Sequence, residues 1–166
     1  MRHVKWIFVV LLTGSLTSFV NKDKPMGGLN VGDVAPDFDI QMQSSGQHDF
    51  SLSDLKGKHV LLSFWASYDA PSRMCNAALN EAFREACPDS VEMVSISFDE
   101  YESIFKETVR KDQIVTPACF VETAGESSDL YEKYQLDGGF TNYLLDENGM
   151  IVAKDISAKE LIAYLN

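Results

Sequence analysis

The segment FSLSDLKGKHVLLSFWAS, residues 50 to 67, decides the fold class of this chain. Its second half, HVLLSFW from His59 to Trp65, is apolar at almost every position, and this pattern predicts a central strand that is buried on both faces. A helical pattern over residues 71 to 86 follows, and Pro88 ends it. A buried strand followed at once by a helix predicts the first unit of an α/β sheet.

Strands and helices alternate along the rest of the chain. Their spacing predicts strands over residues 37 to 43, 90 to 98, 117 to 121, 141 to 145 and 150 to 154, and helices over residues 101 to 111, 128 to 134 and 158 to 165. The Asn148-Gly149 pair predicts a hairpin between the last two strands. Ser157 and Glu160 predict a capping box on the last helix. We therefore expect an α/β fold with a central mixed β-sheet and helices on both faces.

Two of the helical patterns also predict which side chains face the sheet. In the helix after the central strand, the residues expected near one face are Met74, Ala77, Ala78, Phe83 and Ala86. In the helix over residues 101 to 111, the inward side chains are expected to be Ile104, Phe105 and Val109.

The N-terminal 21 residues differ from the rest of the chain. Arg2 and Lys5 precede an apolar run over residues 6 to 12, and small and hydroxyl residues follow, which is typical of a secretory signal peptide. A retained membrane anchor is the alternative, although the segment is shorter than the ~20 apolar residues that span a bilayer. We expect residues 1 to 21 to be a signal peptide, residues 22 to 30 a linker, and residues 31 to 166 one domain, without a stable membrane span after processing.

The charge of the chain limits its partners. The sequence has 14 Lys plus Arg against 25 Asp plus Glu, and without Arg2 and Lys5 the remainder has a net charge of −13. Such a surface repels phosphate backbones and anionic lipid headgroups, which argues against nucleic acid and membrane surfaces as partners. No histidine or cysteine spacing typical of a metal site is present, so we expect no metal and no cofactor.

Three segments carry a resemblance to a known family. They are VGDVAPDFDI (residues 31 to 40), FSLSDLKGKHVLLSFWAS (residues 50 to 67) and YLLDENGMIV (residues 143 to 152). In this order and spacing the chain resembles the exported thioredoxin-like proteins of the TlpA/ResA type, within the wider AhpC/TSA group. The resemblance implies a thioredoxin-like domain over residues 31 to 166, a bacterial periplasm or cell envelope as location, and thiol-disulfide oxidoreductase activity as the family function.

The family motif is altered in this chain. The family has Trp-Cys-x-Pro-Cys after the central strand, and the matching positions here are Tyr68, Asp69, Ala70, Pro71 and Ser72. Both catalytic cysteines are therefore absent, and we expect Asp69 to cap the helix by accepting the N–H of Ser72. The family also has a cis-proline before the strand that faces the dithiol. Phe140 stands at that position, and because a non-proline cis bond costs ~2.5 to 4 kcal/mol, an ordinary trans peptide is expected there.

The remaining thiols are Cys75, Cys87 and Cys119. Cys75 and Cys87 are about 18 Å apart on one continuous helix, while a disulfide needs Cα atoms within about 7 Å, so these two cannot bridge. Cys119, in the strand predicted after Pro117, could approach either of them, but we expect three unpaired and mostly buried thiols. Cys75 lies one turn into the helix, where it is either a small buried side chain or a lone redox thiol that the neighbouring Arg73 helps to ionise.

These observations leave several functions open. The leading hypothesis is an exported thioredoxin-like protein that lacks dithiol activity and acts as a binding or chaperone-like module for an unknown envelope or secreted protein. Tyr68, Phe140 and Tyr143 would offer it an aromatic surface, unless they belong to the core. One alternative is a thiol oxidoreductase or one-cysteine peroxidase that uses Cys75, and another is a structural subunit of an envelope complex. Hydrolysis by Ser72 is disfavoured, because His48 and His59 lie toward the other end of the central strand.

Overall fold

The computed structural model describes residues 27–41, 49–86 and 91–165, and a mixed five-stranded sheet forms its centre. The strand order is β5-β4-β3-β6-β7, with β3 at His59–Trp65, β4 at Val91–Ser97, β5 at Ala118–Val121, β6 at Asn142–Leu145 and β7 at Ile151–Lys154. Strands β3, β4 and β5 pair in parallel, while β6 pairs antiparallel with β3 and with β7. The predicted mixed sheet with an antiparallel edge is confirmed.

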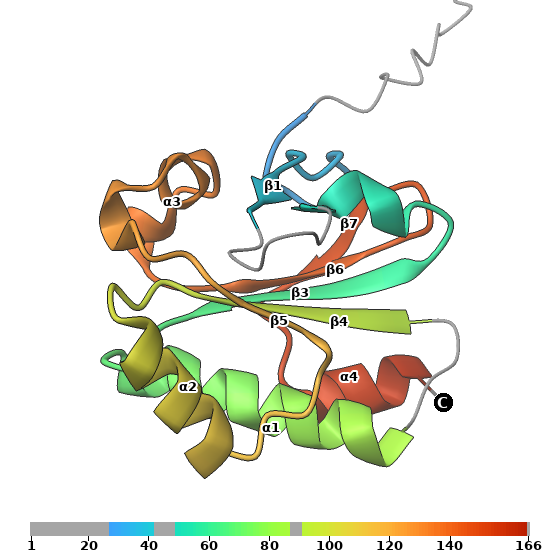
Figure 1. Ribbon diagram of the computed structural model, residues 1–166. Helices are drawn as coiled ribbons and strands as arrows, with labels where there is room; N and C mark the ends of the chain where they lie inside the picture. Colours follow the sequence, from blue (N-terminus) through green and yellow to red (C-terminus); the bar gives the residue numbers. More distant parts are fainter. Residues whose placement is uncertain (1–26, 42–48, 87–90, 166) are drawn as a thin grey trace, which may run out of the picture.

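Helices cover both faces of this sheet (Figure 1). Helices α1 (Ala70–Ala86), α2 (Glu102–Lys111) and α4 (Ala158–Leu165) lie on one face. The other face carries helix α3 (Asp129–Lys133), the 3₁₀ turn Leu52–Leu55 and a small sheet of β1 (Asp39–Ile40) and β2 (Phe50–Ser51). Among the described residues, no helix is long and apolar enough to cross a membrane.

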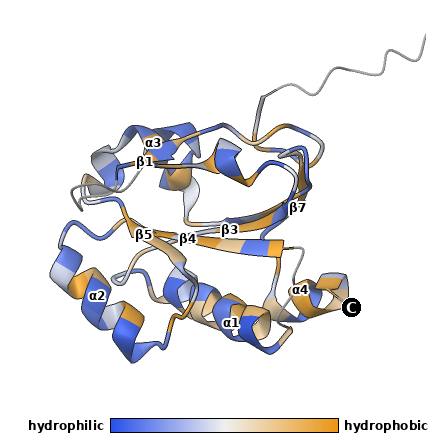
Figure 2. Ribbon diagram, turned by 45° about the vertical axis from the view of Figure 1, so that its right-hand side comes forward, coloured by the Kyte–Doolittle hydropathy of each residue, from blue (hydrophilic) through white to orange (hydrophobic). Residues whose placement is uncertain are grey.

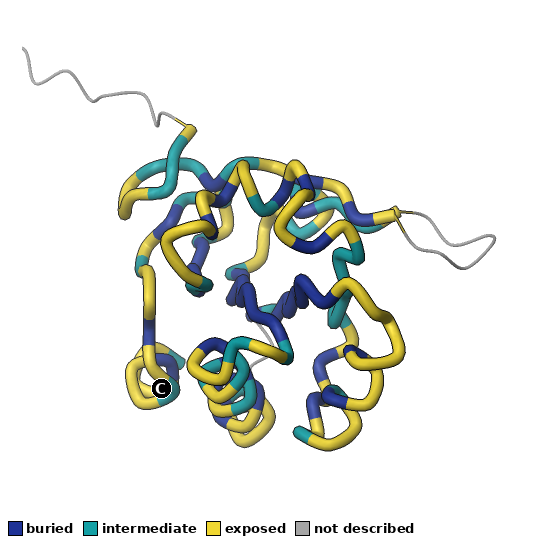
Figure 3. Tube along the Cα trace, turned by 90° about the vertical axis from the view of Figure 1, so that its left-hand side faces the viewer, coloured by how far each residue is buried: buried dark blue, intermediate teal, exposed yellow. Residues whose placement is uncertain are grey.

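Strand β3 sends alternate side chains into two cores, which is why its sequence is apolar throughout. Val60, Leu62 and Phe64 pack on the α3 face, whereas Leu61 packs with residues of α1 and α4. The hydrophobic colour follows the strands in Figure 2, and the strands form the buried centre in Figure 3.

The local signals for turns and caps are confirmed. Asp146 Oδ1 accepts the N–H groups of Asn148 and Met150, and Gly149 takes φ 79° in the β6–β7 hairpin. Ser157 and Glu160 form the capping box of α4 through their side chains and backbone N–H groups.

The predicted inward faces of α1 and α2 are wrong in part. Met74 is 72% exposed and Ile104 is 48% exposed, and Ala78 and Ala86 are also exposed. The buried face of α1 instead includes Ser72, Asn76, Leu79, Asn80 and Ala82. Asn80 is buried because its Oδ1 accepts the N–H groups of Val115 and Thr116, which lie before β5. A hydrogen-bonded asparagine is therefore inside where an apolar pattern alone would place it outside.

Some predictions fall outside the described residues. The predicted signal peptide, most of the linker, His48 and Cys87 are among them, as are the last two residues of the strand predicted over residues 37 to 43.

Candidate functional site

The candidate site lies where β3 ends and α1 begins. Residues 66 to 69 turn the chain from the strand into the helix, and the N–H of Asp69 donates to the carbonyl of Ala66 at 3.2 Å. Facing this turn are the residues that enter β6, from Gly139 to Asn142, and Asp155 after β7. The carboxyl ends of parallel strands are a common place for ligands in open α/β sheets.

Asp69 caps α1, as the sequence predicts. Its Oδ2 accepts the N–H of Ser72 at 3.0 Å, which satisfies one of the free donors at the helix start. The hydroxyl of Ser72 donates to the carbonyl of Asp69 at 3.1 Å and accepts the N–H of Ala66 at 3.4 Å. Ser72 is buried, and its hydroxyl is engaged in holding the turn together.

A pocket of about 400 Å³ brings most of the predicted positions together. Asp69, Pro71, Ser72 and Cys75 line it from α1, and Phe140 lines it from the opposite side. Ala70 is exposed, and Tyr68 is 60% exposed outside the pocket. We call this cavity the motif pocket.

Cys75 lies in the motif pocket as a half-buried, protonated thiol. Burial raises its pKa above the ordinary value, and the negative charge of Asp155 adds to this, while a hydrogen bond from Asn142 Nδ2 to Sγ at 3.6 Å opposes it. Arg73 gives no help to a thiolate. Its guanidinium donates two hydrogen bonds of 2.6 Å to the carboxylate of Asp112.

The other described thiol, Cys119, lies in β5. It is free, like Cys75, and burial raises its pKa to about 11. The expectation of unpaired thiols is confirmed for these two residues, both of which are only partly buried. An ionised, reactive thiolate is disfavoured at both positions near neutral pH.

The aromatic residues divide between surface and core. Tyr143 is fully buried, so it belongs to the core. Phe140 is partly buried and stacks on Phe98 at 5.8 Å between ring centroids, and the rings of Tyr68 and Tyr131 pack edge-on against it at 6.4 and 6.1 Å. We call Tyr68, Phe98, Tyr131 and Phe140 the aromatic cluster. The described residues contain no cis peptide bond, so the expected trans peptide at Phe140 is confirmed.

Besides Phe64 and Gly139, sequence reasoning missed four polar residues of the motif pocket. They are Ser63, Thr141, Asn142 and Asp155. Asn142 has a recognisable structural role, since its side chain accepts the N–H of Ile156 at 2.9 Å and donates to the carbonyl of Ile156 at 3.2 Å. Asp155 takes φ 54° and accepts the hydroxyl of Thr141. Their only sequence signal is their place at strand ends, and for Ser63 a hydroxyl inside an apolar strand.

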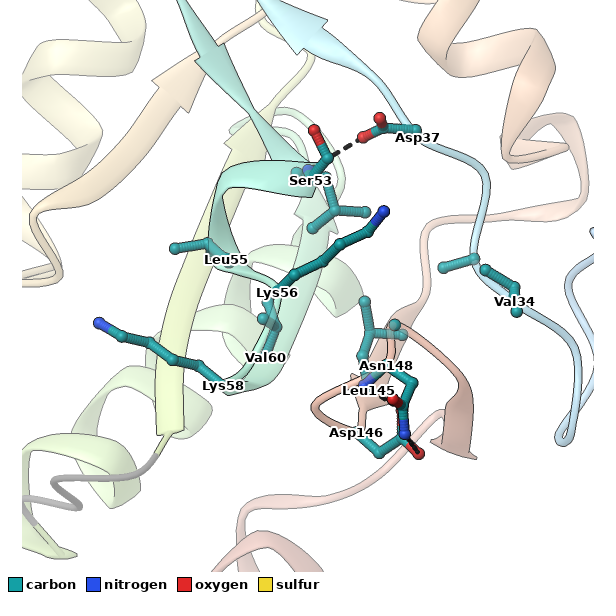
Figure 4. A pocket seen from close by; sticks show the side chains of 13 residues that line it. Val34, Asp37, Ser53, Leu55, Lys56, Lys58, Val60, Leu145, Asp146 and Asn148 are labelled. Carbon is teal, nitrogen blue, oxygen red and sulfur yellow. Dashed lines mark hydrogen bonds between the residues drawn. The ribbon is translucent and has the colours of Figure 1, made fainter.

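A second pocket, of about 90 Å³, lies at the opposite end of β3 (Figure 4). It is lined from the turn before β3, the segment around Val34 and the β6–β7 hairpin, and contains none of the motif positions. Its two carboxylates, Asp37 and Asp146, already accept backbone N–H groups. His59 is at this end of the strand and packs on Tyr164, about 20 Å from the end that carries the motif, by the ~3.3 Å rise of a strand.

The matching family model is the AhpC/TSA family, over residues 31–154. The chain belongs to the AhpC/TSA family. A thiol-disulfide oxidoreductase ResA from Oceanobacillus iheyensis is 29% identical to this AhpC/TSA protein over 166 residues, which covers 96% of this chain and 84% of that relative.

Solved structures show that the fold is thioredoxin-like. A thioredoxin-like protein from Parabacteroides distasonis is 40% identical with a TM-score of 0.70, over 83% of this AhpC/TSA protein and 96% of that one. The thioredoxin domain of a thiol-disulfide oxidoreductase from Bacteroides vulgatus is 25% identical with a TM-score of 0.69, over 83% and 96% of the two chains. The predicted thioredoxin-like fold is confirmed.

Proposed function

We propose that this AhpC/TSA protein is an exported thioredoxin-like module that lacks dithiol redox activity and binds polypeptide segments at the motif pocket. The observation that carries the proposal is the hydrogen bond from the Ser72 N–H to Asp69 Oδ2 at 3.0 Å. It places a carboxylate where the resemblance puts the first catalytic cysteine, and it gives that carboxylate a structural role.

Loss of the dithiol follows from the chemistry of the two replaced positions. Exchange of a disulfide needs a thiolate that attacks one sulfur and a second thiol that releases the mixed disulfide. Neither the Asp69 carboxylate nor the Ser72 hydroxyl performs these steps. In a dithiol protein, the free N–H groups at the start of this helix would lower the pKa of the first cysteine. Here the Ser72 N–H instead donates to the Asp69 side chain.

The lone-thiol alternative has one observation in its favour, which is that Cys75 lines the motif pocket. Two observations oppose it. The pKa of Cys75 is raised by burial, and the guanidinium of Arg73 is bound to Asp112. Both keep Cys75 in its unreactive protonated form near neutral pH.

A binding role is supported by the surface beside the pocket. Tyr68 is 60% exposed, and its ring packs on Phe140, which also lines the pocket. An exposed aromatic side chain at the mouth of a pocket is typical of binding sites, since it offers a large contact area at a low cost in side-chain entropy. Export is supported by the signal-like residues 1 to 21.

The proposal is tested by binding of an unfolded protein, reduced and carboxymethylated α-lactalbumin, to the purified protein. Tyr68→Ala is expected to weaken binding by about tenfold, which corresponds to a loss of about 1.4 kcal/mol of binding free energy. Tyr164→Ala is the matched control, because Tyr164 is 46% exposed near the opposite end of β3. Equal losses in both variants, or no binding by the unchanged protein, would contradict the proposal.

A further inference from the structure

The motif pocket has an excess of hydrogen-bond acceptors. Of the hydroxyl and amide donors that line it, Ser72 donates to the Asp69 carbonyl, Thr141 to Asp155, and Asn142 to the carbonyl of Ile156. Asp69 Oδ1 and Asp155 Oδ2 accept no hydrogen bond from any described residue. The pocket therefore has two carboxylates with free acceptor atoms, and the side chains that line it with a donor still free are the hydroxyl of Ser63 and the weakly donating thiol of Cys75.

Ser63 adds a buried polar group without a partner. It is 2% exposed and lines the pocket from the middle of β3, and its hydroxyl makes no hydrogen bond with the described residues. Its Oγ is open to the pocket rather than sealed in the core, since Asn76 Nδ2 is the one fully enclosed side-chain polar atom without a partner among the described residues. A bound group that donates to Ser63 Oγ would supply a partner there.

The charged side chains that line the pocket are all negative. No lysine or arginine is among the described residues that line it, whereas Asp69 lines it from the start of α1 and Asp155 from the end of β7. The charge of Asp155 reaches the pocket interior, since it contributes to the raised pKa of Cys75. The remaining walls include the apolar side chains Phe64, Pro71 and Phe140.

We infer that the motif pocket receives a lysine side chain of the bound polypeptide. A lysine ammonium has three donors and no acceptor, which matches the free acceptors of Ser63, Asp69 and Asp155. Its methylene stem packs against the apolar walls while its charge stays near the carboxylates. The inference rests on the proposed function and gives it a substrate class, namely extended segments that contain lysine.

The test uses three blocked tripeptides with alanine on both sides of a central lysine, norleucine or acetyl-lysine. Each is titrated into the purified protein and followed by the backbone NMR signals of Ser63, Cys75, Gly139 and Asn142. The lysine peptide is expected to bind about tenfold more tightly than the other two, the value of one charge-assisted hydrogen bond. Equal binding of the three peptides, or no shift of these signals with the lysine peptide, would overturn the inference.

Matched variants locate the effect. Asp155→Asn and Asp69→Asn are each expected to weaken binding of the lysine peptide by about threefold to tenfold. Asp69→Asn keeps the cap of α1, because asparagine is also a good N-cap residue. Ser63→Ala is expected to weaken it about threefold. Glu85→Gln removes the same charge at the exposed far end of α1, about 24 Å from Asp69 by helix rise, and is expected to change binding by less than about twofold.

The outcome is distinguishable from failure of the proposed function. Equal affinity for the lysine and norleucine peptides removes lysine selectivity and leaves polypeptide binding in place. Turnover of a disulfide substrate removes the proposed function whatever the peptides do. An effect of Glu85→Gln as large as that of Asp155→Asn would show attraction by net charge alone and would also overturn the lysine pocket.

Discussion

Two serines lie side by side in the sheet and differ in what surrounds them. Ser63 on β3 and Ser95 on β4 are register partners and are both buried. Ser95 Oγ accepts the indole N–H of Trp65 at 2.9 Å and donates to Asn76 Oδ1 at 3.0 Å. Ser63 makes no such contact and lines the motif pocket. The Ser95 hydroxyl therefore supports the fold on β4, whereas the Ser63 hydroxyl on β3 is free to bind a ligand in the motif pocket.

The largest effect on stability is expected from Ser95→Ala. Removal of this hydroxyl leaves the Trp65 indole N–H and the Asn76 carbonyl oxygen buried without partners, which costs about 2 to 3 kcal/mol. Chemical denaturation monitored by tryptophan fluorescence measures it. A free energy of unfolding within about 0.5 kcal/mol of the unchanged protein would show that Ser95 is not part of the structural framework.

A smaller effect is expected from the Arg73–Asp112 ion pair. Arg73 holds the pKa of Asp112 below its ordinary value, so the pair stabilises the folded state above the ordinary carboxyl pKa and loses this contribution as pH falls through the lowered value. Asp112→Asn is expected to cost about 1 kcal/mol at pH 7 and to cost less as the pH falls below about 4. A loss that is the same at pH 3 and pH 7 would contradict this assignment.

The smallest effect on stability is expected from Ser63→Ala. Because the hydroxyl has no partner to lose, the free energy of unfolding is expected to stay within about 0.5 kcal/mol or to rise slightly. The same denaturation series as for Ser95→Ala measures it, with the two variants as mutual controls. A loss as large as that of Ser95→Ala would show that Ser63 also belongs to the framework.

The sequence predicts the elements that depend on local chemistry. The apolar run of β3, the cap by Asp69 and the Asn148-Gly149 hairpin all involve residues close together in the chain, and all are confirmed. The resemblance placed Phe140 near Asp69, and the motif pocket does bring them together.

The errors come from contacts between distant segments. Met74 points outward on α1 because Asn76 and Asn80 point inward, where Asn76 Oδ1 accepts the hydroxyl of Ser95 on β4 and Asn80 Oδ1 accepts a backbone N–H before β5. Asp155 reaches the pocket from the end of β7 in a left-handed conformation, which aspartate adopts more readily than most residues but which its place in the sequence does not by itself predict. Tyr143 is buried because its ring packs against Phe64 and Tyr134 from distant segments, and no local pattern contains that information.

Disulfide reduction tests the central claim most directly. The protein and its Asp69→Cys/Ser72→Cys variant, in which the family motif is restored at the start of α1, are compared for reduction of insulin by dithiothreitol. The account predicts a rate at the uncatalysed background for the protein and a measurable gain for the variant, because the helix start then lowers the pKa of a cysteine. Turnover by the unchanged protein at the rate of an ordinary dithiol thioredoxin would contradict it.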